Sequence, residues 1–151
     1  MGKIHFRSAD RADRDSLISL AEESPGAPRW TLATWEQVQD SAAKGERNVL
    51  IAASEEGIVG FGVVGVAGDV AEIESLVVVE AARRQGIGRR LCEELMRWAR
   101  MRGSRRAVLE VRVSNDAARA LYESLSFREV AVRKGYYREP EEDGLMMARE
   151  L

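Results

Sequence analysis

The chain has 151 residues, of which 45% are hydrophobic and 32% charged, and its formal net charge is −2. This length fits one domain over residues 1–151 that buries about two-thirds of its unfolded surface, and the balanced charge gives no general basic field for nucleic acid. Because Cys92 and His5 are the only residues of their types, an internal disulfide, a Cys-rich metal site and a Ser-His-Asp triad are excluded, and we expect no metal.

The hydrophobic pattern alternates between strand-like and helix-like periods after an N-terminal hairpin, which predicts an α/β (α+β) fold with a mixed sheet and helices on both faces. The N-terminal half is expected to form a strand over 3–7, a helix over 10–23, a second helix that Thr31 or Thr34 caps and Gly45 ends, and a hairpin of strands 48–54 and 58–67. A strand over 71–79, a helix over 86–102 and a strand over 107–113 are expected to follow. The chain should then form a helix from 114–116 to 125 and two last strands over 127–132 and 145–148.

No segment of the chain resembles a membrane or export signal. The N-terminus lacks the apolar core of a signal peptide, and the longest apolar run, residues 58–67, is too short to span a bilayer. Three glycines in that same run indicate bulges or close approach of the backbone. We therefore expect a cytoplasmic protein without membrane contact.

The loop at residues 83–89, Arg-Arg-Gln-Gly-Ile-Gly-Arg, stands between the expected strand 71–79 and the expected helix 86–102. A helix start leaves backbone N–H groups without partners and carries partial positive charge. Glycine lets an anion approach these groups closely and arginine adds charge, so the loop is typical of a phosphate or pyrophosphate cradle. The carboxyl end of a central strand is also where such sheets bind ligands.

Two well-known glycine-rich phosphate loops do not match this one. A Walker loop continues from glycine to Lys-Ser/Thr, whereas Arg89 follows Gly88, and the dinucleotide fingerprint needs a third glycine where Leu91 stands. Two glycines are also compatible with ordinary turn chemistry. The loop alone therefore does not decide between a ligand site and a structural turn.

Two residues further along stand out from their surroundings. Glu110 lies in the strand 107–113 on the face opposite to Leu109, and a carboxylate in a mostly buried strand is costly unless it is paired or used. An ion pair with Arg112 would explain it without any function. Tyr122 lies beside the apolar stripe of the next helix, where it can be a core aromatic or a site residue.

Taken together, the motifs resemble the GNAT acyltransferase family and, within it, the RimI group of ribosomal-protein-alanine N-acetyltransferases. They are Arg83-x-x-Gly86-x-Gly88, Leu109-Glu110-Val111-Arg112-x-Ser114-Asn115 and Ala120-Leu121-Tyr122-Glu123-Ser124-Leu125-x-Phe127. The resemblance extends from residue 71 to the C-terminus, and residues 1–70 match only in outline. It implies a mainly antiparallel sheet with a central splayed pair of parallel strands, and acetyl-CoA as the co-substrate.

The resemblance also implies how acetyl-CoA would be held. The backbone of Arg84, Gln85, Gly86, Ile87, Gly88 and Arg89 would bind its pyrophosphate, Leu76, Val77 and Val78 would pair with its pantetheine arm like an extra strand, and Asn115 would hold the arm from the other side. A backbone N–H of Val77 or Val78 would polarise the thioester carbonyl. The acetyl group would pass directly to a peptide N-terminus in a ternary complex, which makes Cys92 a packing residue and not a nucleophile.

In the RimI pattern, Glu110 holds the position of the general base and Tyr122 that of the general acid. A carboxylate can take a proton from an α-amine, and a phenol can return one to the leaving thiolate. Glu72 is the alternative base, because histone-type lysine acetyltransferases of the same superfamily place their glutamate there. Glu72 and Glu74 can instead recognise a positive charge on the peptide, or be solvated. We take Glu110 as the base.

The segment at 133–137, Arg-Lys-Gly-Tyr-Tyr, resembles the Arg-Arg-x-Tyr-Tyr of this group, at the loop that clamps the peptide backbone. Tyr136 and Tyr137 are therefore expected to bind the substrate, with an exposed aromatic turn as the alternative. Ser126 replaces the glycine of the usual Leu-Gly-Phe, and a left-handed backbone there would cost about 1 kcal/mol.

The function that the resemblance implies is acetylation of a protein or peptide N-terminus, and specifically that of a ribosomal protein that begins with alanine. The enzyme is expected to be a monomer or weak dimer that does not bind nucleic acid directly. Two alternatives stay open. One is a GNAT enzyme that acetylates lysine or a small amine, with Glu72 as its essential carboxylate. The other is a non-catalytic acyl-CoA-binding module, against which the presence of both Glu110 and Tyr122 counts.

Overall fold

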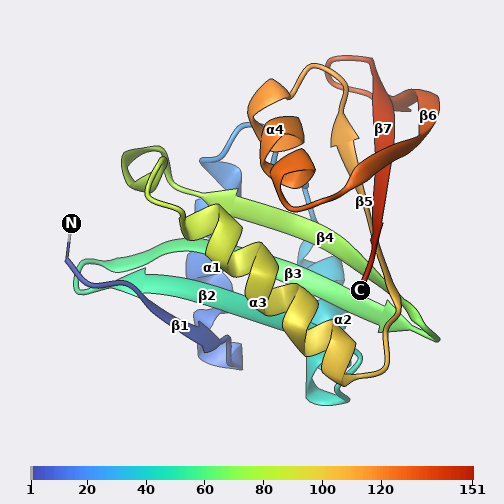
Figure 1. The fold of residues 1–151 in the computed structure, drawn as a ribbon. Coiled ribbons are helices and arrows are strands. Elements are labelled where there is room, and N and C mark those ends of the chain that lie inside the picture. Colours follow the sequence, from blue (N-terminus) through green and yellow to red (C-terminus); the bar gives the residue numbers. More distant parts are fainter. Residues whose placement is uncertain (1) are drawn as a thin grey trace.

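The computed structural model describes residues 2–151 and contains a seven-stranded sheet in the order β1-β2-β3-β4-β5-β7-β6 (Figure 1). The strands are β1 (His5–Ser8), β2 (Arg47–Ser54), β3 (Gly57–Ala67), β4 (Val70–Val78), β5 (Arg106–Arg112), β6 (Arg128–Tyr137) and β7 (Glu142–Glu150). The helices are η1 (Arg11–Asp13), α1 (Arg14–Glu22), α2 (Leu32–Ala43), η2 (Glu80–Ala82), α3 (Ile87–Met101) and α4 (Asp116–Ser124). The expected mixed sheet is confirmed.

The central strands β4 and β5 are parallel to each other, whereas all other neighbouring strands are antiparallel. Their register runs from Val70 opposite Arg106 to Ile73 opposite Leu109, and the pairing ends there. Beyond Ile73, no strand in the described part of the chain pairs with β4 on this side. The expected splayed pair is thereby confirmed, and the gap between the strands opens toward their carboxyl ends (Figure 1).

Helices cover both faces of the sheet, and each face has its own hydrophobic cluster. On one face, α3 contributes Leu91 and Leu95, neither of which has any exposed surface. On the other face, α1 and α2 pack Leu17 and Trp35 against the sheet, where the Trp35 ring meets Phe61 of β3 with 5.8 Å between centroids. The hydrophobic pattern therefore predicted the two layers of helices correctly.

A β-bulge interrupts β4 near the point where the strand leaves β5. Val63 of β3 is opposite Ser75 while Val64 is opposite Ile73, so Glu74 has no residue opposite it. The extra residue changes which side chains face α3, because Ile73 does so before the bulge and Leu76 after it. The bulge thus turns the strand and redirects its side chains next to the gap.

The glycines of β3 allow close packing of the sheet, as the sequence suggested. A Cβ atom on Gly62 would lie 2.6 Å from Cδ1 of Leu95, and one on Gly60 would lie 2.8 Å from the carbonyl oxygen of Val77. Both distances are too short for a real contact. Glycine therefore brings α3 and β4 closer to β3 than any other residue would allow.

The largest differences from the expected elements lie in the C-terminal hairpin. Strand β6 continues to Tyr137 and β7 begins at Glu142, whereas the sequence predicted strands over 127–132 and 145–148. The polar run between them lacks the alternation of a strand, but the backbones pair across the hairpin, and the Gly135 N–H donates to Oδ1 of Asp143 at 2.9 Å. Tertiary pairing therefore decides these boundaries.

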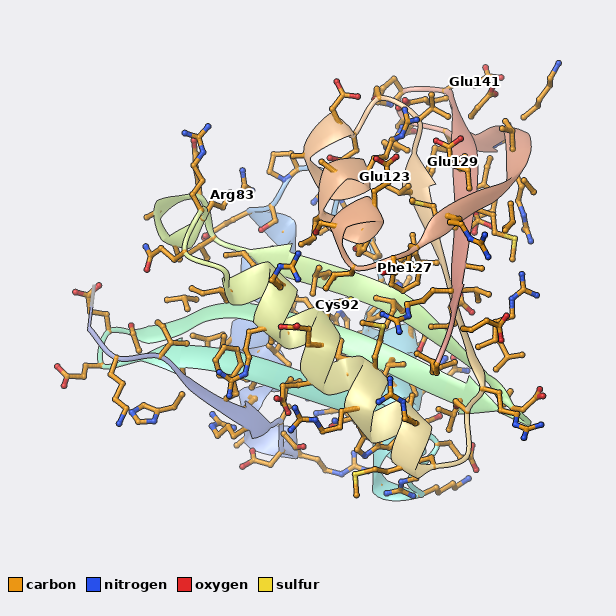
Figure 2. All side chains as sticks on the ribbon, in the orientation of Figure 1. Arg83, Cys92, Glu123, Phe127, Glu129 and Glu141 are labelled. Carbon is orange, nitrogen blue, oxygen red and sulfur yellow. The ribbon has the colours of Figure 1, made fainter. Side chains whose placement is uncertain are left out.

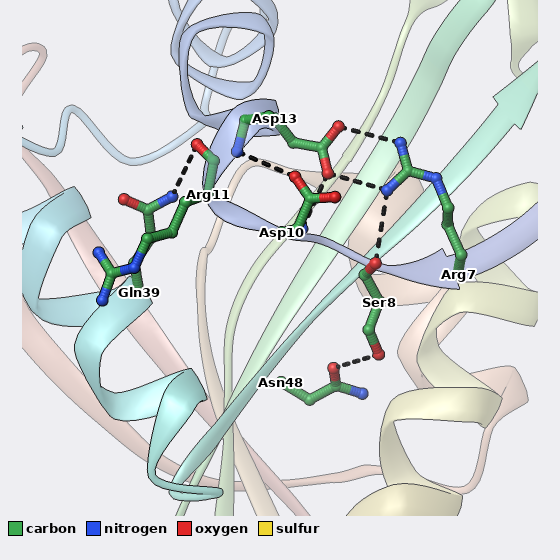
Figure 3. A network of polar contacts seen from close by, with 8 residues as sticks. Arg7, Ser8, Asp10, Arg11, Asp13, Gln39 and Asn48 are labelled. Atoms are coloured by element: carbon green, nitrogen blue, oxygen red, sulfur yellow. Dashed lines mark hydrogen bonds and ion pairs between the residues drawn. The ribbon is translucent and has the colours of Figure 1, made fainter.

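The N-terminal strand is attached to the first helical turn by a polar network (Figure 3). Arg7 donates to both carboxylate oxygens of Asp13 at 2.8 and 2.9 Å, and Asp10 forms a capping box with Asp13. Hydrogen bonding to Arg7 lowers the pKa of the Asp13 carboxyl. Of the helices that residues 2–151 form, none combines the length and the apolar character that a bilayer crossing requires.

Candidate active site

The loop between β4 and α3 has the features of an anion cradle. Gly86 precedes α3 in a left-handed conformation (φ 77°), and none of the side chains of residues 2–151 caps the first N–H groups of the helix. Arg84 is also left-handed (φ 65°), which is strained for a residue with a side chain. Nε of Arg83 donates to the carbonyl oxygen of Val78 at 3.1 Å, which attaches the loop to β4 (Figure 2). Free N–H groups at a helix start fit a pyrophosphate.

The splayed half of β4 leads directly into this cradle. The backbone of Leu76, Val77 and Val78 has β3 on one side and, among residues 2–151, no strand on the other. An extended amide-bearing ligand such as the pantetheine arm of acetyl-CoA could pair with such an edge as a strand does. Gly88 lies where α3, β4 and α4 meet, because a Cβ on it would be 3.5 Å from Cδ2 of Leu121 and 3.7 Å from Cγ2 of Val78.

Asn115, which is expected to hold the pantetheine arm from the side opposite to β4, also has a structural role. It is the N-cap of α4, where its Oδ1 accepts from the Ala118 N–H at 3.1 Å. Its side-chain amide makes no hydrogen bond with any other described residue, so the donor end of Asn115 is free for a ligand.

Tyr122 is buried on α4, at 7% exposure, and its ring packs edge-on against Phe127 with 5.8 Å between centroids. Its hydroxyl has no hydrogen-bond partner among residues 2–151. Burial, followed by nearby Cys92 and Tyr137, raises the pKa of Tyr122. The phenol therefore stays protonated near neutral pH, as a proton or hydrogen-bond donor must.

Glu110 is paired with a residue that the sequence did not indicate. Nε of Arg133, on β6, lies 3.0 Å from Oε1 of Glu110, whose side chain is only 14% exposed. The other oxygen, Oε2, is buried and has no partner in the described chain. Arg112 instead contacts Glu142 at 3.3 Å and the carbonyl oxygen of Pro140 at 2.9 Å. The suggested Glu110–Arg112 pair is therefore wrong.

The two tyrosines expected to bind substrate lie in strand β6 and not in a loop. Their rings are edge-on with 5.0 Å between centroids, and Tyr136 is 47% exposed. Burial, followed by Tyr136 and Glu110, raises the pKa of Tyr137 to about 12. Tyr137 in turn raises the pKa of Tyr122, so the charge environment of Tyr137 links it to both Glu110 and Tyr122.

Glu72 and Glu74, which the sequence placed together, have different environments. Glu74 is held by Arg47 through two hydrogen bonds of 2.7 and 2.8 Å. Glu72 has neither an ion pair nor a hydrogen bond with another described side chain. Partial burial, then the charges of Glu74 and Glu110, raise the pKa of Glu72. Both glutamates line a pocket of about 250 Å³, which Val70 of β4 and Val108 of β5 also line, in the half where these strands pair.

Two features of this region escaped the sequence analysis. Arg133 was noted as part of a motif, but its partner Glu110 is far away in sequence and only the fold brings them together. Ser75 is 6% exposed with an unpartnered Oγ at the bulge, and no sequence signal identified it. Cys92 on α3 is a packing residue as expected, since it has no exposed surface and burial raises its pKa to about 12 (Figure 2).

Comparison with known proteins agrees with this geometry. Residues 14–127 match the model of the acetyltransferase (GNAT) family. The [ribosomal protein bS18]-alanine N-acetyltransferase of Escherichia coli K12 is 37% identical over 117 residues, which cover 76% of this chain and 79% of that protein. The N-alpha-acetyltransferase RimI of Mycobacterium tuberculosis is 43% identical over 79 residues, 52% of this chain and 48% of that protein.

Solved structures show the same fold over nearly the whole chain. The crystal structure of the E. coli ribosomal-protein-S18-alanine N-acetyltransferase superposes with a TM-score of 0.81 and 28% identity, covering 98% of this chain and 94% of that one. Arabidopsis thaliana NAA60 in complex with acetyl-CoA gives a TM-score of 0.87 at 20% identity, covering 99% of each chain, which shows the fold alone. The chain belongs to the GNAT family and is an N-acetyltransferase related to RimI, with a fold that implies binding of acetyl-CoA.

Proposed function

We propose that the chain acetylates the α-amine of a protein N-terminus, and that its acceptor is a ribosomal protein beginning with alanine. The observation that carries the proposal is the mostly buried carboxylate of Glu110, whose Oε2 has no partner in the described residues and whose charge influences Tyr137, which in turn influences Tyr122. A carboxylate and a phenol at one gap supply the base and the acid that amide formation needs. The names of the E. coli and M. tuberculosis relatives support an α-amine as acceptor.

In the proposed reaction, Glu110 takes a proton from the acceptor amine, directly or through one water. The nitrogen lone pair then forms a C–N bond to the acetyl carbon while the C–S bond breaks, and the sulfur leaves with the bonding electrons. The acylated nitrogen then loses its second excess proton, and the thiolate gains one, by way of Tyr122 or water, so that a neutral amide and free CoA result. Removing a proton from an α-amine with a pKa near ~8 costs roughly 1–1.5 kcal/mol at neutral pH, whereas a lysine amine near ~10.4 costs over ~4 kcal/mol. One carboxylate therefore suits an α-amine better.

Tyr122 would stabilise the leaving thiolate, whose negative charge needs a donor. Its raised pKa makes complete transfer of the proton uphill at first, so hydrogen-bond donation comes before transfer. The proposed binding residues for acetyl-CoA are Leu76, Val77, Val78, Arg84, Gln85, Gly86, Ile87, Gly88, Arg89 and Asn115. Tyr136 and Tyr137 are proposed to border the acceptor peptide.

Glu72 favours a second candidate, a lysine or small-amine acetyltransferase. It has a raised pKa beside Glu110 and no partner within residues 2–151, as a base could have. In that case Glu72 would be essential and Glu110 dispensable. The two candidates therefore make opposite predictions about the same pair of residues.

The test is release of free CoA from acetyl-CoA with two matched peptides. One begins with a free alanine and has no lysine, and the other has a blocked N-terminus and one internal lysine. We expect turnover on the first peptide, and a loss of at least about a hundredfold in Glu110→Gln, the size typical of an acid–base group. Glu72→Gln should retain most of the activity. Turnover on the lysine peptide alone, or dependence on Glu72 alone, would overturn the proposal in favour of the second candidate.

A further inference from the structure

The contact between Arg133 and Glu110 is asymmetric. Nε of Arg133 lies 3.0 Å from Oε1, whereas Oε2 is buried and accepts no hydrogen bond from the described residues. A bidentate pair, such as Arg47 makes with Glu74, would give both carboxylate oxygens a hydrogen bond. Arg133 therefore restrains the Glu110 carboxylate without forming a bidentate pair with it.

We propose that Arg133 is a positioning residue for acetyl transfer, which holds the Glu110 carboxylate in the orientation from which it acts on the acceptor amine. This inference rests on the proposed role of Glu110 as base. Arg133 lies on β6, which is an edge strand, and its ring-face contact with Tyr136 at 5.4 Å between Cζ and the centroid holds the guanidinium over the site. The peptide-binding hairpin and the base are thereby connected through one side chain.

The charges around Glu110 leave Arg133 as the cation that balances it. Arg112, the next residue on the same face of β5, already forms an ion pair with Glu142. Its Cζ also lies 4.4 Å from the ring centroid of Tyr137, in a cation–π contact. The charged and titratable side chains that the structure places near Glu110 are Arg133 and Tyr137 from β6 and Glu72 from β4. Without Arg133, Glu110 would be left with the influence of the Glu72 carboxylate, and two negative charges repel each other.

A purely structural role for Arg133 makes a different prediction. Its side chain is 53% exposed, so its removal should not unfold the chain. If Arg133 only supported Tyr136, its loss would raise the KM for the peptide and leave kcat unchanged. If the contact instead blocked the base until the peptide displaced it, removal of Arg133 would increase kcat.

The experiment measures kcat and KM for the free-alanine peptide in the wild type, Arg133→Gln and Arg133→Lys. Arg128→Gln is the matched control, because Arg128 is an exposed arginine on the same strand, at the far end from Glu110. The melting temperature of each variant confirms its folding. Wild-type turnover on this peptide tests the proposed function by itself, before any variant is compared.

We expect kcat of Arg133→Gln to fall about tenfold or more, because a misplaced base loses its alignment. The KM for the peptide should stay within a few-fold of the wild-type value, because both tyrosines beside it are unchanged. Arg133→Lys should retain more of kcat than Arg133→Gln, because lysine keeps the charge but not the planar guanidinium. Arg128→Gln should match the wild type.

A double-mutant cycle then separates action through Glu110 from any other effect. If Arg133 acts through the base, Arg133→Gln should have no further effect on kcat in a Glu110→Gln background. Equal losses in both backgrounds would overturn the proposal. So would a change confined to KM, or a faster enzyme.

Discussion

Strands β4 and β5 have two halves that differ in almost every physical respect. Where they pair, Ala71 and Ala107 lie opposite each other with no exposed surface, and the backbones satisfy each other. Where they separate, the bulge at Glu74 turns β4, and two buried polar atoms, Oγ of Ser75 and Oε2 of Glu110, have no partners in the described chain. One half has the character of a core and the other that of a site.

The difference shows how a single sheet can supply both rigidity and an open binding edge. A buried polar atom without a partner costs stability, so such atoms persist where a ligand or substrate can complete them. The paired half fixes the two strands against α3, and the splayed half then holds its unpaired groups in place. Substitutions in the two halves should therefore affect different measurements.

The largest expected effect comes from Glu110→Gln in the splayed half. We expect kcat to fall by about a hundredfold to ten-thousandfold, because the proposed base is lost. The melting temperature should stay close to that of the wild type, since glutamine has the same shape and can still accept from Arg133. Kinetics and thermal unfolding of the same preparation check both parts. A large drop in melting temperature would mean that Glu110 belongs to the core.

Leu109→Ala, one residue earlier on the opposite face of β5, should show the reverse. Leu109 is 2% exposed opposite Ile73, and its truncation should lower the free energy of unfolding by about 2–5 kcal/mol. At temperatures where the variant is folded, kcat should remain within a few-fold of the wild type. Chemical denaturation measures the first quantity. A folded but inactive Leu109→Ala variant would contradict the expectation that the paired half affects stability and the splayed half affects catalysis.

Left-handed backbone strain lies outside the strands, at Arg84 before α3 and at Ser126 after α4, and two substitutions should separate structural strain from functional strain. Ser126, with φ 71°, is left-handed as the sequence analysis considered, and Ser126→Gly should stabilise the chain by about 1 kcal/mol without changing kinetics. Arg84→Gly should relieve similar strain in the cradle but weaken acetyl-CoA binding, because a cation is removed. Denaturation and calorimetric titration with CoA distinguish them. Equal CoA affinity in both variants would argue against the cradle.

The smallest expected effect concerns Glu72 and depends on pH. The pKa of its carboxyl is raised in the folded chain, so the folded state holds this proton more tightly than the unfolded state and loses stability as pH rises through that window. Glu72→Gln should therefore raise the melting temperature slightly at neutral pH and leave it unchanged below about pH 4. Glu74→Gln is the control, and it should destabilise, since Glu74 is paired with Arg47. A gain that persists at low pH would contradict the charge explanation.

Local patterns in the sequence determined much of this protein. The alternation of Leu109 with Glu110, the glycines of β3 and the stripe of α3 are properties of neighbouring residues, and they predicted the layers, the cradle and the position of the candidate base. The Gly-rich loop was also placed correctly, because a strand that runs into a helix needs only short-range geometry.

Only the tertiary structure decided which groups meet. The sequence offered Arg112 as partner of Glu110, but the fold brings in Arg133, and it separates Glu74, held by Arg47, from Glu72, which no described residue holds. It also extended β6 through Tyr136 and Tyr137, where no alternation was visible. Long-range contacts depend on strand register and on the bulge in β4. These arise from the packing of the whole sheet and not from any short stretch of chain.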